Sequence, residues 1–548
     1  MSLAKICEVG NHPFELTTED IAAYQKFGFE PLPICFPHQH QWRLAFRNDR
    51  FLHRRKCDLT GASIISMYPP DTPYPVYERE AWFSDKWDPF SYGRDFDFNK
   101  PFFEQFAELQ KVVPRCSLFQ ANCVNSEYCN CTMYDKNCYL IFGGDFNEDC
   151  MYGSLPMHCK DSVDCDWTEQ CQLCYFCAYS ENCYGCRFTF RSKGCSDCAF
   201  IEDCIGCTEC ILSTNLRNKS FYIENKPYSK QEYFSKKAEL LNGSFEQQTK
   251  MLKRFMELRQ RRPVKFANIL NGENVTGDII FNSKNCRNCY ECIDSEDCLQ
   301  CYTIFNAKDC FNADYDGHRG TLNFNNVACG TAYRTWFSRF TIEASDIEYC
   351  EHTNFSKNLF GCIALRHKQY CILNKQYTKE TFEKLRLAII EHMKKTNEWG
   401  RYFPKTLSLF PYNQTTASFF FPRTREQALA EGFIWKNEEA HDFMPQIYKI
   451  PDSIQDVTDG ILNETLACEA TGKNFRIIPQ EFKFYRQQNI PIPRRHPDTR
   501  YGDRLALRNP FKIFERKCER CNASVQTTYA PERTETIYCE KCYLESVY

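Results

Sequence analysis

Cysteine recurs with a period of twelve residues in the middle of the chain, and this period constrains the fold more than any other feature. Between Cys171 and Cys210 the repeat opens each time with a C-x-x-C pair. The four pairs are Cys171/Cys174, Cys183/Cys186, Cys195/Cys198 and Cys207/Cys210. The pattern returns at Cys286/Cys289 and Cys298/Cys301, with Cys310 twelve residues after Cys298. Such a period is typical of stacked units that bury a core only against their neighbours. We therefore predict a mainly β chain with a cysteine-periodic β-solenoid in two tandem copies.

The spacing also restricts where the cysteines lie in each repeat. From Cys138 to Cys210 every cysteine follows the previous one by a multiple of three residues. Residues i and i+3 of a flat strand face opposite sides, so these cysteines must flank a corner or a helical turn. Three interpretations stay open: a buried ladder of free thiols, zinc held in a row between neighbouring pairs, and iron–sulfur clusters. The unbroken multiples of three favour the first interpretation, in which free thiols are stacked in the interior.

The cysteine content also bears on the compartment. The chain has 36 cysteines, yet no apolar segment of a secretory signal follows Met1 and no run of eighteen apolar residues occurs. These features predict a cytoplasmic protein without membrane contact, whose thiols are free or bind metal rather than form disulfides.

Two duplications organise the chain. Residues 6–77 and 467–538 share five features in the same order. They are a knuckle-like cysteine, an amphipathic helix, a double-proline turn, a basic run that ends in a cysteine, and a final stretch in which SMYPPDTPYPVY aligns with TTYAPERTETIY. In the interior, LRNKSFYIENKPYSKQEY from Leu216 matches LRHKQYCILNKQYTKETF from Leu365. Each match predicts a strand followed by a helix, capped by Ser229 or Thr378.

These duplications divide the chain into four parts. Residues 1–114 form a degenerate zinc-ribbon-like end module with an aromatic and acidic extension, and 115–265 form the first solenoid with its helix. Residues 266–440 form the second solenoid with a helix and a connector, and 441–548 form a linker and the C-terminal zinc-ribbon module.

The C-terminal module carries the most specific chemical motif. Two C-x-x-C knuckles, Cys518/Cys521 and Cys539/Cys542, are separated by seventeen residues. Four thiolates from two knuckles form a closed tetrahedral Zn²⁺ site, with β-prone sequence between them for a ribbon hairpin. We expect one structural zinc ion here, and more elsewhere are possible; a rubredoxin-type iron centre is the smaller alternative.

The N-terminal copy lacks this ligand set. Alignment of Cys57 with Cys518 puts Thr60, Glu78 and Ala81 at the other three ligand positions, so we expect no metal there. Cys7 and Cys35 with His38 or His40 could form another site nearer the start. Isolated side chains are the simpler interpretation of those four residues.

The chain resembles a family of uncharacterised cysteine-rich zinc-ribbon proteins from ultra-small bacteria of the candidate phyla radiation, Parcubacteria especially. The resemblance rests on RKCDLTGASIISMYPPDTPYPVY, WDPFSYGRDFDFNKPFFEQF, ENKPYSKQEY, LFPYNQTT and RLALRNPFKIFERKCERC with YCEKCYLESVY, and spans essentially the whole chain. It implies a shared architecture and a zinc ribbon, and no activity. The missing N-terminal ligands are a departure from it.

The arginine-rich runs of the two end modules suggest a partner. Arg43 and Arg47 in one copy, and Arg504 and Arg508 in the other, are spaced to contact phosphates of a nucleic acid or ribonucleoprotein. Alternatively, these arginines pair with acidic residues of the solenoid inside the protein. The net charge of the whole chain is −3. Charge complementarity alone does not decide between the two.

No catalytic motif of the common classes occurs, since the chain has no G-x-G-x-x-G, P-loop, H-E-x-x-H or G-x-S-x-G sequence. The sequence therefore favours a non-catalytic zinc-binding scaffold that binds nucleic acid or protein partners. A metal-storage or thiol/iron–sulfur redox protein is the alternative, and a β-helix hydrolase is a more distant one.

Overall fold

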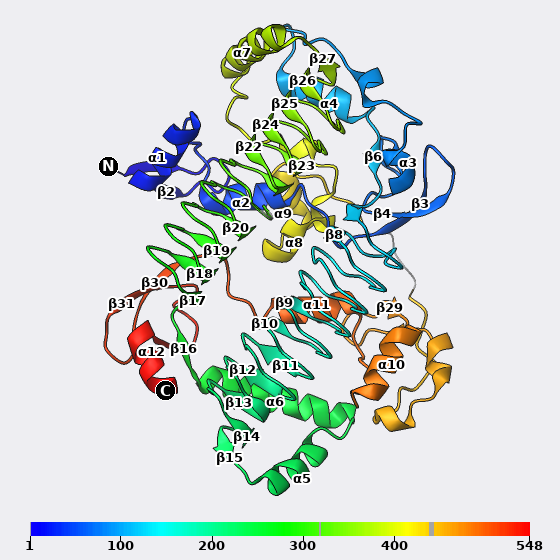
Figure 1. Ribbon diagram of the computed structural model, residues 1–548, viewed down its shortest axis with the longest axis vertical. Helices are drawn as coiled ribbons and strands as arrows, with labels where there is room; N and C mark the ends of the chain where they lie inside the picture. The colour runs from blue at the N-terminus through cyan, green and yellow to red at the C-terminus, as the bar shows by residue number, and fades with distance from the viewer. Residues whose placement is uncertain (1, 317–318, 438–442) are drawn as a thin grey trace.

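The computed structural model describes residues 2–316, 319–437 and 443–548. Two stacks of short parallel strands dominate it, and they lie on opposite sides of the molecule's centre (Figure 1). We call them the first ladder (120–223) and the second ladder (269–372). Among the described residues, twelve α-helices accompany the many short strands, so the class is mixed; the expectation of a mainly β chain was too narrow.

In both ladders most residues pair with the one twelve positions further on; in the second ladder the offset is eleven at Ile269–Ile280 and thirteen at Lys308–Thr321. Ala178 pairs with Asp166, and Ala199 with Ile211, both in parallel register. The first ladder contains β7 (Gln120–Ala121), β8 (Thr132–Met133), β9 (Asp166–Glu169), β10 (Ala178–Glu181), β11 (Arg187–Phe190), β12 (Ala199–Glu202), β13 (Thr208–Thr214) and β14 (Ser220–Ile223). The second contains β17 (Ile269–Leu270), β18 (Gly277–Phe281), β19 (Cys289–Ile293), β20 (Tyr302–Phe305), β21 (Val327–Gly330), β22 (Tyr333–Trp336), β23 (Arg339–Ile342), β24 (Ser345–Glu348), β25 (Lys357–Phe360) and β26 (Gln369–Ile372).

The backbone explains the multiples of three. A left-handed residue occurs at nearly every third position of the ladders; Gln170, Leu173 and Phe176 have φ of 50°, 53° and 55°. Each of them immediately precedes a cysteine of the Cys171–Cys174–Cys177 run. The turn at each left-handed residue lets side chains three apart both point inward, so the predicted corners are present. Left-handed backbone costs an L-residue about 1–2 kcal/mol, which the inter-rung hydrogen bonds offset.

Free thiols fill the interior of the first ladder. Every cysteine from Cys138 to Cys210 is buried, and all are unpaired, as predicted. Each thiol is placed to donate to carbonyls of the ladder; Cys171 Sγ lies 3.5 Å from the oxygens of both Glu169 and Ser180. The cysteines thus form a continuous buried stack that carries its own hydrogen bonds.

Each ladder ends in a hairpin and a helical segment. β15 (Lys226–Pro227) closes the first ladder and β27 (Lys375–Gln376) the second. The first is followed by α5 (Lys230–Leu240) and α6 (Phe245–Arg261), the second by α7 (Lys379–Lys395). Ser229 and Thr378 are the N-caps, as predicted, while the expected single helix after Ser229 is broken into two.

The two end modules contain the same elements in the same order. The first has β1 (Leu3–Ile6), β2 (Pro13–Leu16), α1 (Thr18–Phe27), α2 (Phe36–Leu44), β3 (His53–Lys56), β4 (Ser63–Ser66), β5 (Val76–Tyr77) and α3 (Arg79–Phe83). The second has β28 (Leu466–Ala467), β29 (Asn474–Phe475), α10 (Pro479–Gln487), α11 (Pro497–Leu505), β30 (Phe514–Lys517), β31 (Ser524–Thr527), β32 (Thr536–Tyr538) and α12 (Glu540–Val547). The remaining helices are α4 (Phe102–Gln110), α8 (Thr416–Phe420) and α9 (Arg425–Ala430).

Each end module contacts both ladders in a crossed arrangement. β5 pairs with β6 (Arg115–Cys116), just before the first ladder, whereas α1 packs on the second ladder through Tyr24 and Phe311. Conversely, β32 pairs with β16 (Pro263–Lys265), just before the second ladder, and α10 packs on the first through Tyr485 and Tyr175. The modules therefore bind the two ladders to each other.

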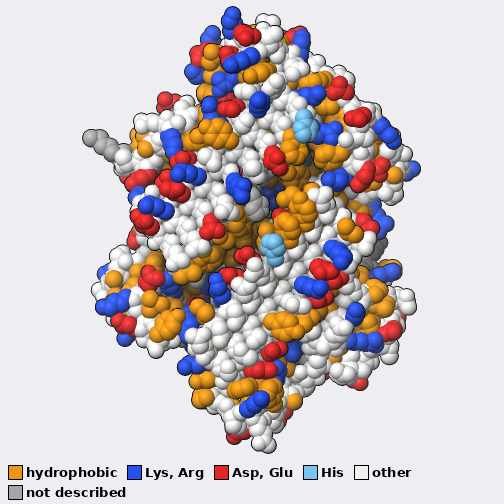
Figure 2. Space-filling view, in the orientation of Figure 1, with side chains coloured by type: hydrophobic (Ala, Val, Ile, Leu, Met, Phe, Trp, Pro, Cys, Tyr) orange, Lys and Arg blue, Asp and Glu red, His pale blue; other side chains and the backbone are white. Residues whose placement is uncertain are grey.

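Hydrophobic side chains gather along a hollow in the middle of the face shown in Figure 2. A cavity between the ladders is lined by Met133 and Leu155 of the first ladder and by Phe305 and Ile342 of the second. Within the described residues, no helix combines the length and apolar character needed to cross a bilayer.

Candidate metal centres

The four C-terminal cysteines converge on one point. Their sulfur atoms all lie within 4.8 Å of one another, and the Sγ atoms of Cys521 and Cys539 are 3.7 Å apart. Cys518 and Cys521 lie in the turn between β30 and β31, and Cys539 is the N-cap of α12, which carries Cys542. The expected hairpin between the knuckles is therefore displaced: the first knuckle forms the tip of the β30–β31 hairpin.

Backbone groups favour a thiolate in this cluster. Burial raises the pKa of Cys518, but the backbone N–H groups of Cys539 and Cys521 outweigh it and lower the pKa to about 6. N–H groups pointing at sulfur are what a metal-binding thiolate requires. The donor set thus fits a closed four-sulfur metal site.

A second four-residue cluster lies in the N-terminal module. Ligand atoms of Cys7, His12, Cys35 and His38 all lie within 4.8 Å of one another. The Nδ1 atom of His38 is 3.3 Å from Cys7 Sγ and 3.0 Å from Cys35 Sγ. The interpretation of these side chains as isolated was therefore wrong, because the turn after β1 brings Cys7 against the start of α2.

Backbone hydrogen bonds and a glycine allow the four side chains of this cluster to come together. The backbone N–H groups of Gly10 and Cys35 lie 3.5 and 3.4 Å from Cys7 Sγ. A Cβ atom at Gly10 would lie 2.5 Å from Cε1 of His38 and 2.6 Å from Nδ1 of His12, so only glycine leaves room for both rings. The donor set, two sulfurs and two imidazoles, fits a tetrahedral metal site.

Sequence reasoning missed His12 and included His40 as an alternative. His12 lies five residues after Cys7 in the first knuckle, a spacing that could have identified it. His40 lies elsewhere: its ring stacks on Tyr302 with centroids 3.4 Å apart, and its Nε2 is 3.6 Å from an oxygen of Asp314. It belongs to the contact between α2 and the second ladder.

The duplicated positions show which ligands each module has lost. Cys468 corresponds to Cys7, and the other positions of that set carry Lys473, His496 and Thr499. In the first module Cys57 retains a thiol, and it accepts a hydrogen bond from the N–H of Glu78 at 3.2 Å. Each module therefore keeps one complete four-ligand set and one remnant.

Both complete sets lie beside the second ladder. The N-terminal cluster is next to α1, where Asp20 accepts a hydrogen bond from Gln300 at 2.6 Å. The C-terminal cluster adjoins β32, which pairs with β16 before that ladder. In Figure 1 these elements, α1 and α12, are on the left, whereas the remnants beside β3 and β29 are on the right.

The thiols of the ladders do not assemble in this way. Within the described residues, the two clusters above are the only groups of three or more Cys, His, Asp or Glu ligand atoms that all lie within 4.8 Å of one another. The zinc-row and iron–sulfur interpretations of the periodic cysteines find no matching geometry there.

The four arginines predicted to contact nucleic acid are directed into the protein. Arg43 Nε lies 2.6 Å from Asp314 Oδ2, and Arg504 Nη1 lies 2.8 Å from Asp164 Oδ1. The side chains of Arg43, Asp314 and Asp164 are 0% exposed, and that of Arg504 is 1% exposed. Two arginines of the predicted interface are therefore buried and paired with carboxylates of the protein.

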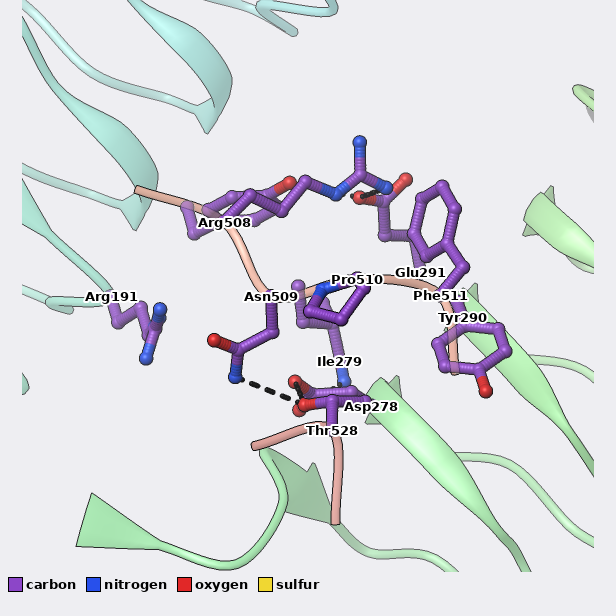
Figure 3. Close-up of a pocket in the computed structure, with 11 residues that line it drawn as sticks. Arg191, Asp278, Ile279, Tyr290, Glu291, Arg508, Asn509, Pro510, Phe511 and Thr528 are labelled. Carbon is purple, nitrogen blue, oxygen red and sulfur yellow. Dashed lines mark hydrogen bonds and ion pairs between the residues drawn. The ribbon is translucent and has the colours of Figure 1, made fainter. Parts of the chain in front are cut away.

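The other two arginines are also held inside. Arg47 Nε lies 2.8 Å from Asp49 Oδ1, and its guanidinium covers the Tyr315 ring. Arg508 reaches over Phe511 to Glu291, with Nη2 2.5 Å from Oε1 (Figure 3). Arg43, Arg504 and Arg508 thus pair with carboxylates of the ladders, as the internal-pairing alternative has it, whereas Arg47 pairs with Asp49 of its own module.

Comparison with known proteins adds no family. No protein-family model matches the chain, and no curated protein matches it. Among solved structures the chain is similar to a crystal structure described as a candidate acetyltransferase from Desulfovibrio desulfuricans G20, at 8% identity and a TM-score of 0.10. That match covers 48% of this chain and 69% of that chain. A TM-score this low carries no inference about fold or activity.

Proposed function

We propose that the protein is a non-catalytic scaffold held together by two structural Zn²⁺ ions, one in each end module. The carrying observation is that two separate clusters each place four protein donors within 4.8 Å of one another. A tetrahedral site with four protein ligands leaves no position for a substrate, which is the arrangement of structural rather than catalytic zinc. Sulfur and imidazole donors in this geometry favour zinc over harder cations.

The scaffold itself we infer to be a pair of β-solenoids closed by zinc-ribbon-like modules. The twelve-residue parallel register and the inward stack of thiols support this interpretation. Because each module contacts both ladders, a metal that fixes the module also fixes the angle between the ladders. The rigid outer surfaces would then be the part available to a partner.

Metal analysis of the purified protein tests the proposal. The wild type should contain two zinc ions per chain, and Cys539→Ser and Cys35→Ser should each remove one. Cys57→Ser is the matched control, because Cys57 lies in a remnant with one thiol, and it should leave the zinc content unchanged. Zinc content that neither Cys539→Ser nor Cys35→Ser alters would refute the proposal.

The storage alternative makes a different prediction for the same measurement. A metal-storage or iron–sulfur protein would contain several metal ions per chain, or iron with acid-labile sulfide, in the ladders. Only the two end-module clusters have ligand geometry among the described residues, so this alternative is the weaker one.

A nucleic-acid or protein partner stays part of the proposal. Since Arg43, Arg47, Arg504 and Arg508 are engaged internally, phosphate contacts would have to come from other cations. Exposed Lys136, Lys160 and Lys193 on the first ladder are paired with glutamates on neighbouring rungs, which weakens a purely electrostatic interface. Salt-dependent binding of random RNA and DNA to the wild type would test this part.

A further inference from the structure

An arginine-rich cavity lies between the first ladder, the end of α6 and the C-terminal module. Its volume is about 120 Å³. Its charged residues are Arg191, Arg259, Arg262, Arg533, Glu202 and Glu535. Among these lining residues, four guanidiniums and two carboxylates leave an excess of two positive charges. A cavity of this kind attracts anions, because its low-dielectric walls weaken the screening by water.

Most of this charge surrounds a single carboxylate. Glu202 is fully buried, and Arg259 binds it with Nε at 2.5 Å and Nη2 at 3.1 Å. The Nη2 atom of Arg262 also lies 2.9 Å from a Glu202 oxygen. Glu202 is thus shared by two arginines. The next carboxylate, Asp203, lies 3.8 Å from Arg262 Nη1 and is itself paired with Arg217.

A third arginine adds to the same centre. Arg191 Nη1 is 3.6 Å from Glu202 and donates a hydrogen bond to the hydroxyl of Tyr529 at 2.9 Å. Figure 3 shows Arg191 at the edge of the neighbouring pocket, extending from the first ladder. Its remaining donors add to the positive charge around Glu202.

A buried donor near this centre has no partner. Within the described residues, the Nε atom of Arg262 has no hydrogen-bond partner, although Arg262 is only 6% exposed. An unsatisfied buried donor is unfavourable, more so on a charged group, so the site gains free energy from any acceptor that reaches it. This donor is a second indication of an anionic ligand, independent of the charge excess.

Arg533 and Glu535 form an ion pair on the more exposed side of the cavity. The Arg533 side chain is 35% exposed, and its Nε lies 3.0 Å from an oxygen of Glu535. Next to it, Met256, Leu507 and Tyr529 supply an apolar wall. The cavity thus has a cationic interior, a partly exposed arginine held by Glu535 and Asn509, and a surface for an uncharged group.

We propose that this cavity binds a phosphate dianion, either free phosphate or the phosphate group of a small organic molecule. A dianion matches the excess of two positive charges. Planar guanidiniums bind phosphate oxygens with paired hydrogen bonds, which lysine cannot do. The apolar wall favours a phosphate carried on an organic group over the free ion.

Calorimetric titration of the full-length, zinc-loaded protein at low salt tests this site with two probes, inorganic phosphate and phenyl phosphate. Both should bind, and phenyl phosphate more tightly if the apolar wall contributes. Arg533→Gln should weaken binding about tenfold, the loss expected for one charged hydrogen bond. Glu535→Gln should strengthen binding, because it removes a competing carboxylate and frees Arg533.

A matched control separates this site from general surface charge. Arg254 lies on α6, which also carries Arg259, but it is outside the cavity, and its side chain is 47% exposed. Arg254→Gln should leave the affinity of both probes unchanged. The proposal is overturned if neither probe binds, or if Arg533→Gln and Glu535→Gln do not shift the affinity in opposite directions. Equal affinity for the two probes would identify free phosphate as the ligand.

Discussion

Arg43 and Arg504 occupy the same position in the two end modules and bind carboxylates of opposite ladders. Arg43 pairs with Asp314 of the second ladder, and Arg504 with Asp164 and Asp166 of the first. The same kind of contact between module and ladder is therefore present in both copies of the module. These two ion pairs give the arginines at this position of both runs a structural role inside the protein.

The first prediction concerns the cost of breaking one of these pairs. Arg43→Met leaves Asp314 buried without its partner, which should destabilise the fold by about 3–5 kcal/mol. Arg254→Gln breaks the exposed pair with Glu224 and should cost about 1 kcal/mol or less. Urea unfolding followed by tryptophan fluorescence measures both. Equal unfolding midpoints for the two variants would show that the Arg43–Asp314 pair does not hold the module in place.

The second prediction uses the glycine in the N-terminal cluster. Gly10→Ala places a methyl group 2.5 Å from the His38 ring and 2.6 Å from His12, so the imidazoles must turn away from Cys7 and Cys35. The variant should lose one zinc ion per chain while it keeps the C-terminal one. Gly502→Ala is the control, because a Cβ there meets no atom within 4 Å. Full zinc content in Gly10→Ala would exclude His12 or His38 as a ligand.

The sequence allowed one metal cluster to be predicted and not the other for a physical reason. Cys518, Cys521, Cys539 and Cys542 form two local pairs, and each pair is fixed by its own turn, so spacing alone identifies the site. The N-terminal set combines Cys7 with His38 across a helix and a proline turn. Such a cluster depends on tertiary packing, which a linear pattern does not contain.

The ladders and the arginines also differ in how far a local sequence pattern can predict their structure. The multiples of three predicted corners and buried thiols correctly, because the repeat fixes local backbone geometry. Whether Arg504 faces solvent or Asp164 depends on how the end module crosses to the far ladder. No local pattern specified that crossing, and the two alternatives for the arginines had equal weight until the contact was seen.

The third prediction follows from the position of both complete clusters beside the second ladder. Removal of metal with a strong chelator should increase amide exchange in α1 and in the paired strands β16 and β32. The pair β5–β6, which adjoins the remnant around Cys57, should keep its protection. Hydrogen exchange with mass spectrometry resolves these segments. A similar rise at β5–β6 would mean that the metals stabilise the whole molecule and not one side.

The fourth prediction is a pH dependence at a buried carboxylate. Glu351 lies 3.0 Å from Arg339 and 3.5 Å from Arg115. Burial raises its pKa, but the two guanidiniums outweigh burial and lower the pKa to about 2 from its ordinary 4.5. Because the folded-state pKa is lowered, the stabilisation is complete above about pH 4.5 and is lost as the pH falls towards 2.

The difference in melting temperature between wild type and Glu351→Gln measures this effect. The variant should be less stable at pH 7, and the difference should shrink as the pH is lowered from 4.5 towards 2. Glu246→Gln, which removes an exposed partner of Lys250, should show a small difference at every pH. A constant difference for Glu351→Gln across this range would mean that the carboxylate titrates at the same pH in the folded and unfolded chain.

The fifth prediction concerns the reactivity of the stacked thiols. Burial raises the pKa of Cys150 and Cys165 well above the ordinary 9, so little reactive thiolate is present at these two positions at neutral pH. The other cysteines from Cys138 to Cys210 are shielded from reagents because they are buried. Brief treatment of the native, zinc-loaded protein with N-ethylmaleimide should therefore label few cysteines of the ladders. Cys123, at the open start of the first ladder, is partly exposed and should react first. The same treatment in urea should label every cysteine, which shows that none was oxidised. Rapid native labelling at Cys150 and Cys165, with the fold intact, would contradict a closed thiol stack and favour an interior open to solvent.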